Sequence, residues 1–364
     1  MKVGIFTPYD LSHEGGVNRH ARALASALAR SGHAALVVGP ASGAVPEGCE
    51  GIRGVVPIPA NGSVARIGLF ASRRAVARIL EREGFDLLHV HEPLVPGPAR
   101  IALRLAKVPV VATFHANSER EVPLQALARR IGALGLSRIA HGIAVSREAK
   151  RFSRAIYRGR TAVIPNGVDL VHYARAIRAG DHAAPASGAL KVLFVGRFGE
   201  ERKGLPVLLD ACARLVASGR PVALAVAGEG PRERFEGAAR RANARFLGRV
   251  ADGEILDALA ECDVFCAPSL HGESFGMVVV EAMAAGCPVV ASDIPGYAEA
   301  ARGAAILVPP GRPEALAEAL WRVWQDGPLR ARLAQHGVAR AQALDWSRVA
   351  EHVLRIYRRA GVRE

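Results

Sequence analysis

Short apolar runs alternate with segments of helical periodicity through the first half of the chain. The runs lack the polar alternation of a half-exposed strand, and they lie at residues 2–6, 34–40, 87–91, 108–115 and 142–146. Continuous apolar runs of this length are typical of parallel strands that are covered on both faces. After the first run, residues 15–32 carry apolar side chains at helical spacing and end at a glycine, which predicts a helix there.

The pattern restarts at KVLFVGR, which echoes the opening KVGIFTP, and continues up to PVVASD. This repetition predicts an α/β protein of two tandem Rossmann-like domains with a cleft between them. We expect the first domain at residues 1–170 and the second at residues 171–344. An Ala/Gly/Pro-rich linker is expected at residues 175–190. The amphipathic segment 345–364 is expected to form a helix that packs back onto the first domain.

The composition is that of a folded protein, since half of the 364 residues are hydrophobic. No apolar run approaches the ~18 residues of a membrane span. The apolar run at the N-terminus is too short for a signal peptide, so we expect a cytoplasmic protein. The five cysteines form no C-x-x-C pair, which favours inert thiols over a disulfide or a metal site.

The positive charge is uneven along the chain. Residues 1–170 hold 23 Lys+Arg and 12 Asp+Glu, a difference of +11, out of a total of +14. A basic surface of this kind suits nucleic acid, anionic lipid or a phosphorylated substrate. A nucleic-acid binder would usually interleave aromatic residues with the basic ones, and no such pattern or known module occurs here.

Two places after predicted strands could bind a phosphate. Gly15 and Gly16 stand where a helix begins, so that backbone N–H groups there can approach an anion. Arg197 and Lys203 flank the loop after the strand KVLFV and would suit a diphosphate. The alternative for the second place is a solvated basic loop in which Glu200 and Glu201 pair with these cations.

The stretch HGESFGMVVVEAMAAGCPVVASD, at residues 271–293, places two glutamates around the start of a small-residue helix. Ser274 to Gly276 would open this helix, near residue 275, with free N–H groups that favour negative charge. Glu273 precedes the opening, and Glu281 lies two turns further along on a largely apolar helix. Glu281 would then need hydrogen-bond partners such as ribose hydroxyls. The alternative is a helix cap at the first glutamate and a surface residue at the second.

Together these features resemble glycosyltransferase family 4, whose members have the GT-B fold. The resemblance spans nearly the whole chain and rests on GGV, TFH, IPNGVD, GRFGEERKG, GEGP and the two-glutamate stretch. Finer similarity to the phosphatidyl-myo-inositol mannosyltransferases of actinobacteria lies in IPANGSVAR, FDLLHVHEPLVPGPARIALRLAK and VATFHANS. It implies a retaining transfer of mannose from GDP-mannose to the inositol of phosphatidylinositol. The nucleotide-sugar is the donor, and no metal is required.

The resemblance also implies roles for individual residues. His115 and Glu273 would lie beside the transferred sugar and the reacting bond. The donor would be bound by Gly15, Gly16, Arg197, Lys203, Ser274, Phe275, Gly276, Met277, Val278 and Glu281. The acceptor would be bound by Tyr9, Asn61, Ser63 and Arg66. No carboxylate nucleophile is evident, so a front-side displacement is expected.

A basic amphipathic helix is expected at residues 70–83, with Arg73 beside a stripe of Arg74, Arg78 and Arg82. Val76, Ile79 and Leu80 supply its apolar side. Such a helix suits an anionic membrane surface, so we expect peripheral binding at the inner face of the plasma membrane. The alternative is an ordinary surface helix.

Two rival functions remain open at this point. The first is a family 4 transferase that uses a UDP-sugar on a soluble inositol phosphate or another lipid or sugar acceptor. The second is a non-catalytic nucleic-acid binder, which the basic charge alone supports. The first differs from the main hypothesis only in donor and acceptor, because no residue in the sequence reads the base directly.

Overall fold

The apolar runs form parallel strands in two separate sheets of the computed structural model, which describes residues 1–60, 63–116, 135–179 and 188–362. The chain divides into two compact units. Unit 1 holds Met1–Gly167 and Trp346–Glu364, and unit 2 holds Val168–Asp345. The chain thus passes between the units at residues 167/168 and 345/346, beside the expected bounds at 170/171 and 344/345.

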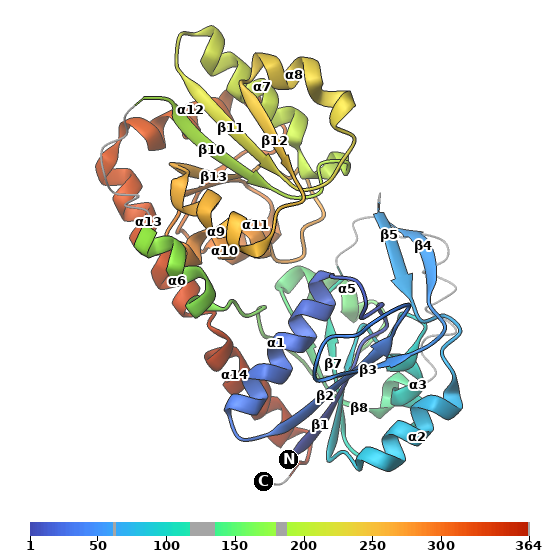
Figure 1. Cartoon of the computed structure of the whole chain (residues 1–364). Coiled ribbons are helices and arrows are strands. Elements are labelled where there is room, and N and C mark those ends of the chain that lie inside the picture. The colour runs from blue at the N-terminus through green and yellow to red at the C-terminus, as the bar shows by residue number, and fades with distance from the viewer. Residues whose placement is uncertain (61–62, 117–134, 180–187, 363–364) are drawn as a thin grey trace. The chain divides into compact units, whose positions relative to one another are not determined.

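The sheet of unit 1 has the order β3-β2-β1-β6-β7-β8-β9 in the described residues, and its neighbouring strands run parallel (Figure 1). A separate antiparallel hairpin, β4-β5, lies outside this sheet. The strands are β1 (Lys2–Phe6), β2 (Ala34–Pro40), β3 (Cys49–Ile52), β4 (Val56–Ala60), β5 (Ser63–Ile67), β6 (Leu87–His91), β7 (Val110–Phe114), β8 (Ile139–Ala144) and β9 (Thr161–Val163).

Helices cover both faces of this sheet because alternate side chains of each strand point to opposite sides. Ile5 packs with α1 (Gly16–Arg30) and the C-terminal helix α14 (Trp346–Arg359), which lie side by side. Phe6 packs with residues of α2 (Arg73–Glu83) and α3 (Pro98–Leu105) on the other face. The remaining helical segments are α5 (Arg147–Arg154) and the 3₁₀ turn η1 (Leu136–Arg138).

The sheet of unit 2 has the order β12-β11-β10-β13-β14-β15, again with parallel neighbours. This is the 3-2-1-4-5-6 order of the doubly wound dinucleotide-binding fold, in which ligands bind where the order reverses. The strands are β10 (Leu190–Val195), β11 (Val222–Ala227), β12 (Ala244–Gly248), β13 (Val264–Ala267), β14 (Val289–Ser292) and β15 (Ile306–Val308). The reversal lies between β10 and β13.

Two groups of helices enclose this second sheet. One buried cluster joins the sheet to α7 (Leu205–Ala217) and α12 (Pro313–Gln325). The other joins it to helices on the opposite face, which are α6 (Leu170–Ala179), α9 (Asp252–Glu261), α10 (Met277–Ala284) and α11 (Pro295–Ala301). The remaining helical segments are α8 (Glu236–Arg241), α13 (Gly327–Gln342), η2 (Glu201–Lys203) and η3 (Arg232–Phe235).

The two-domain α/β fold is therefore confirmed, but two local expectations need correction. The linker expected at residues 175–190 is wrong in its first part, because residues 170–179 form α6 and pack into unit 2. The helix expected from about residue 275 begins at Met277, with Gly276 as its N-cap. Among the helices of the described residues, none is both long enough and apolar enough to cross a bilayer.

A glycine lies where the two loops at the reversal of strand order in unit 2 pack against each other. Gly204 precedes α7 in the left-handed region, with φ +71°, and a Cβ atom on it would stand 2.0 Å from the carbonyl oxygen of Pro268. The loop after β10 and the loop after β13 can therefore pack together only because residue 204 has no side chain.

We expect Gly204→Ala to destabilise unit 2 more than Gly219→Ala does. Both glycines have similar positive φ values, +71° and +76°, but a Cβ on Gly219 would meet nothing within 4 Å. Each alanine carries a backbone cost of about 1–2 kcal/mol, and Gly204→Ala adds a steric cost of about 1–3 kcal/mol. Urea unfolding of the two variants measures the difference. Equal losses of stability would contradict this packing.

Candidate active site

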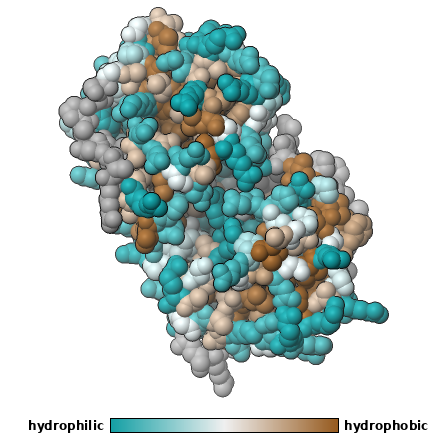
Figure 2. Space-filling model, viewed as in Figure 1, coloured by the Kyte–Doolittle hydropathy of each residue, from teal (hydrophilic) through white to brown (hydrophobic). Residues whose placement is uncertain are grey.

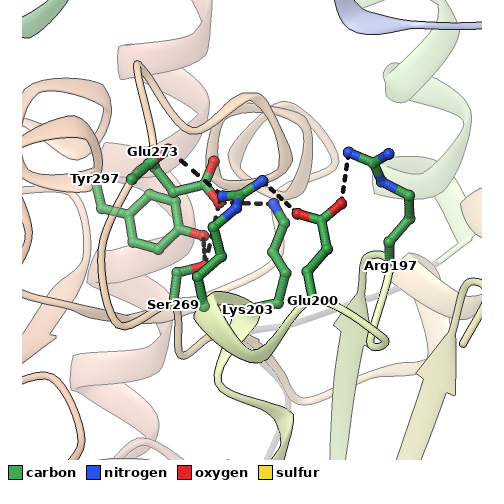
Figure 3. A network of polar contacts seen from close by, with 8 residues as sticks. Arg197, Glu200, Lys203, Ser269, Glu273 and Tyr297 are labelled. Atoms are coloured by element: carbon green, nitrogen blue, oxygen red, sulfur yellow. Dashed lines mark hydrogen bonds and ion pairs between the residues drawn. The ribbon is translucent and has the colours of Figure 1, made fainter. Parts of the chain in front are cut away.

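The loops after β10 and β13 meet at the carboxyl edge of the unit 2 sheet, and the contact between them is ionic (Figure 3). Oε1 of Glu273 accepts hydrogen bonds from Nζ of Lys203 at 2.6 Å and from Nη1 of Arg202 at 2.8 Å. The backbone N–H of Leu270 donates to the carbonyl oxygen of Arg202 at 2.7 Å. Side chains and backbone thus hold the two loops together.

Glu273 is ionised in this setting. Burial by itself would raise the pKa of this carboxyl group, since its side chain is only 13% exposed. The attraction and hydrogen bonds of Lys203, followed by those of Arg202, outweigh burial and hold the pKa below its usual value. Removal of one partner from so buried a pair would leave the remaining charges uncompensated.

A second carboxylate extends the charged group towards the end of β10. Glu200 is 5% exposed and pairs with Arg197 at 2.7 Å and with Arg202 at 2.6 Å. The whole cluster contains three cations, Arg197, Arg202 and Lys203, and two carboxylates, Glu200 and Glu273. Its net charge is therefore +1. The alternative of a solvated loop is thus half right, because Glu200 does pair with Arg197 but is itself buried. A net positive edge of this kind suits an anionic ligand.

Tyr297 supports the loop that carries Glu273. Its hydroxyl group shares a hydrogen bond of 2.7 Å with Ser269, whose hydroxyl also donates to Glu273 at 3.3 Å. The tyrosine ring fills the space beside Gly276, where a Cβ atom would lie 2.4 Å from the ring. Gly276 also has φ +92°, so this position requires glycine on both steric and conformational grounds.

The helix α10 presents one open face beyond this loop. Met277, Val278 and Glu281 are half-buried, whereas Val279 and Val280 belong to the core. Ser274 is half-buried as well. Phe275 is 2% exposed and packs in the same core, so its side chain does not face a ligand and it can offer only backbone groups. The first N–H groups of a helix have no intrahelical acceptor, which leaves donors at the start of α10.

The glycine pair of unit 1 begins α1, as expected. Gly15 is its N-cap and Gly16 its first residue, and a Cβ atom on either would meet nothing within 4 Å. The preceding loop is held by Asp10, which accepts hydrogen bonds from the backbone N–H groups of Ser12 and Ser42 at 3.0 and 3.1 Å. The start of α1 is therefore a fixed, open turn of the kind that binds anions.

Two of the predicted acceptor residues lie next to each other in unit 1. Tyr9 forms a β-bridge with Ile67, and the N–H of Asp10 donates to the carbonyl oxygen of Arg66 at 2.9 Å. Tyr9 is half-buried, and burial raises the pKa of its hydroxyl group, helped by the charge of Glu92. The prediction for Asn61 lies outside the described residues. Ser63 is described only as the first residue of β5.

His115 directly follows β7 and lies within a group of stacked imidazoles. Its Nε2 atom lies 2.9 Å from Nδ1 of His91, and its ring is edge-on to that of His20. On the far side of His91, the ring of His89 bonds to Tyr357 and Thr113, both at 2.6 Å.

Burial keeps all these imidazoles neutral. It lowers the pKa of His20 to about 4 and that of His89 to about 3. Burial and the neighbouring imidazoles place the pKa values of His91 and His115 well below the usual 6.5. His115 therefore acts near neutral pH as a hydrogen-bonding group and not as a cation.

Three of these histidines bring ring nitrogens close together, as the ligands of a metal ion would be. In the described residues, His20, His91 and His115 each offer a ring nitrogen, and these atoms lie within 4.8 Å of one another. Bonds of about 2.0–2.1 Å to a tetrahedral zinc ion would place them roughly 3.4 Å apart. Nδ1 of His91 and Nε2 of His115 lie closer than that, at 2.9 Å, and share a hydrogen bond, so we assign no metal to this group.

The basic helix α2 differs from the expectation in two ways. Val76 and Ile79 are buried in the core of unit 1, so the apolar side of this helix is not available to a membrane. Arg82 pairs with Glu50 and with Glu83, the latter at 2.7 Å, which offsets its charge. Arg73, Arg74 and Arg78 are exposed. The amphipathic pattern therefore reflects packing onto the sheet, as in an ordinary surface helix.

Several residues around the candidate site were not predicted from the sequence. They share buried positions at strand ends or contacts with the predicted residues, and they are Asp10, His20, His89, His91, Glu92, Arg202, Ser269 and Tyr297. The available signal was position after a buried strand, which Glu92 and Ser269 both satisfy. A contact between residues far apart in the chain, such as the one between Ser269 and Tyr297, cannot be predicted from the sequence pattern.

Comparison with known proteins identifies the chain. A family model described as Glycosyltransferase Family 4 matches residues 14–172, and one described as Glycosyl transferases group 1 matches residues 189–326. The chain is 39% identical over 368 residues to a protein of Mycobacterium tuberculosis named phosphatidyl-myo-inositol mannosyltransferase, covering 98% of this chain and 96% of that protein. The chain belongs to glycosyltransferase family 4. This confirms the resemblance found in the motifs, and the family 4 protein is an enzyme that transfers a sugar.

Further relatives agree with this assignment. A Propionibacterium freudenreichii protein of the same name is 33% identical to this glycosyltransferase and covers 99% of it and 96% of its own length. Among solved structures, HepE from Anabaena in complex with UDP superposes with a TM-score of 0.76 at 23% identity, over 98% of this chain and 100% of that one. At that identity the likeness shows the fold alone, which is the GT-B fold of two Rossmann-like domains.

Proposed function

We propose that this enzyme transfers mannose from GDP-mannose to the inositol ring of phosphatidylinositol, with retention of configuration. The observation that carries the proposal is the identity of 33–39%, over nearly the full length, to proteins named for this activity. The donor and the acceptor are taken from kinship, and the geometry of each unit supports them.

The donor contacts are proposed separately for each unit. In unit 2, Lys203 and Arg197 neutralise the diphosphate, and the N–H groups at the start of α10 donate to it, from Ser274 to Val278. Glu281 binds the ribose from the open face of that helix, and Glu273 binds hydroxyl groups of the sugar. In unit 1, the turn of Gly15 and Gly16 offers N–H groups to a phosphate.

The acceptor contacts belong to unit 1 in this proposal. Tyr9 and Arg66, which the backbone holds side by side, bind the inositol phosphate together with Asn61 and Ser63. His115 lies beside the sugar and offers a neutral ring nitrogen to it. In a front-side displacement, the bond from the sugar to the donor phosphate breaks as the acceptor oxygen bonds to the same face. The proton of the acceptor hydroxyl group passes to the leaving phosphate.

The enzyme reaches its lipid, in this proposal, as a peripheral protein at the inner face of the plasma membrane. Exposed arginines on α2 stand next to Phe70 and Leu69, which are 75% and 41% exposed. The β4–β5 hairpin adds Val64, which is 56% exposed, and Figure 2 shows hydrophobic surface on the side of unit 1 that carries this hairpin. Apolar contact thus comes from the segment before α2 and from the hairpin, while the helix supplies charge.

A transfer assay tests the function directly. We expect the enzyme to add one hexose to phosphatidylinositol in vesicles when it is supplied with GDP-mannose, as measured by mass spectrometry. UDP-glucose and UDP-N-acetylglucosamine are supplied in parallel, and a soluble inositol phosphate replaces the lipid in another arm. Glu273→Ala should lower turnover at least 100-fold, whereas Glu261→Ala, an exposed carboxylate on α9, should not. Product formed only from a UDP-sugar would refute the mannose donor.

Vesicle co-sedimentation tests the membrane surface. Each cation near an anionic surface contributes about 1 kcal/mol, so replacing Arg73, Arg74 and Arg78 by glutamine should weaken partitioning on the order of 100-fold. Replacing three exposed arginines of unit 2, Arg234, Arg240 and Arg241, is the matched control. If the partitioning of the α2 variant is unchanged, the arginines of α2 do not bind the membrane surface.

A further inference from the structure

Glu92 is a buried carboxylate to which the proposed mechanism gives no task. It directly follows β6 and is 3% exposed. Its backbone has φ +47°, a left-handed conformation that few residues other than glycine adopt. A strained backbone around a buried charge is costly, and such positions concentrate at functional sites.

The contacts of this carboxylate lead to the end of the neighbouring strand. Oε1 of Glu92 accepts hydrogen bonds from the backbone N–H groups of His115 at 2.5 Å and Ala116 at 2.6 Å. The N–H of Glu92 donates to the carbonyl oxygen of Thr113 at 2.9 Å. Side chain and backbone of one residue therefore fix the chain on both sides of Phe114, where β7 ends.

These bonds reach a part of the chain that the sheet itself does not hold. Residues beyond the end of a strand have lost their ladder partners, and their N–H groups need another acceptor. A carboxylate that accepts two N–H groups makes charge-assisted bonds, which are about twice as strong as neutral ones. The peptide groups of His115 and Ala116 are thus held in one orientation, which fixes where the side chain of His115 leaves the backbone, and the hydrogen bond with His91 at 2.9 Å then orients the ring.

Two roles for such a carboxylate can be separated by geometry. A nucleophile needs an exposed oxygen atom that can approach the sugar. Glu92 is almost fully buried, and its Oε1 atom is already engaged by two donors. A group whose bonds all go to the protein acts on the arrangement of its neighbours, so the geometry points away from covalent catalysis.

We propose that Glu92 is the positioning residue for His115, holding the peptide groups after β7 so that the imidazole is presented to the transferred sugar. The inference rests on the proposed function only in that it names His115 as the group beside the sugar. Small displacements of a reacting geometry cost large factors in rate, so loss of this support should lower kcat while the binding of nucleotide to unit 2 stays unchanged.

The charge of Glu92 should be visible in pH dependence. Burial raises the pKa of its carboxyl group to about 7, although the two N–H donors oppose this. Among the described residues, its titratable neighbours are Tyr9 after β1, on whose hydroxyl group its charge acts, His91, which precedes it on β6, and His115 after β7, whose N–H it binds. Tyr9 has a raised pKa and both histidines have lowered ones, so none of the three changes charge between pH 6 and pH 8.5.

Three variants separate positioning from mere stability. Glu92→Ala removes the acceptor, Glu92→Gln keeps a neutral acceptor in the same place, and Glu148→Ala is a control that removes a carboxylate paired with Arg151 on α5. We expect kcat to fall at least tenfold in Glu92→Ala, with the Kd for GDP within twofold of that of the wild type. Glu92→Gln should recover most of the loss, and Glu148→Ala should match the wild type.

The pH profile is a readout that a structural role would not move. The wild-type kcat should rise by a small factor with pH around 7, because the protonated carboxyl group is already a neutral acceptor and ionisation only tightens its two bonds, and this rise should be absent in Glu92→Gln. Selective ¹⁵N-histidine labelling gives a second readout that needs no turnover. The N–H resonance of His115 should shift with a midpoint near pH 7 in the wild type and stay constant in Glu92→Gln.

Two results would overturn the proposal. If the loss in Glu92→Ala disappears when rates are normalised to the folded fraction, Glu92 only stabilises unit 1. If Glu92→Gln is as inactive as Glu92→Ala, the charge acts in the chemistry and not through His115. Should the wild type fail to use GDP-mannose at all, the His115 resonance still decides the present question, so failure of the proposed function is told apart from failure of this inference.

Discussion

The ion pairs between Glu273 and its two cations, Lys203 and Arg202, are the interaction on which the unit 2 site depends. They join the loop after β10 to the loop after β13 at the point where the strand order reverses, which is where this fold binds ligands. The carboxylate is buried and charged because two cations compensate it. The same ammonium group that is proposed to bind the diphosphate is thus already engaged, so donor binding must redistribute its charge between a carboxylate and a phosphate.

In unit 1, the described part of the candidate site is built from neutral imidazoles and not from ion pairs. Its sheet ends in stacked imidazoles whose pKa values burial has lowered, so that these rings carry no charge near neutral pH. The anion contact proposed for this unit is made by the backbone N–H groups at Gly15 and Gly16. Glu92 accepts hydrogen bonds from the backbone N–H groups of His115 and Ala116, and its burial connects the arrangement of His115, the group proposed to lie beside the sugar, to the packing of the sheet.

The fold was predictable from the sequence because buried parallel strands leave continuous apolar runs. Lys203 and Glu273 were found because each follows such a run, and strand ends meet at one edge of a sheet. Their direct contact was not predicted, since it joins residues 70 positions apart. The apolar side of α2 was misread for a similar reason, because periodicity does not say whether Val76 faces lipid or the core. The linker was misplaced because Ala-rich residues 175–179 form a helix once unit 2 supplies a packing surface.

The central claim, that Lys203 is shared between Glu273 and the diphosphate, is tested most directly by calorimetry with GDP as the ligand. Lys203→Met should weaken GDP binding about tenfold or more, because it removes a charge-assisted contact. Glu273→Gln frees that ammonium group and removes a carboxylate, so it should bind GDP at least as tightly as the wild type. If Glu273→Gln instead weakens GDP binding as much as Lys203→Met does, the two side chains do not share the lysine as described.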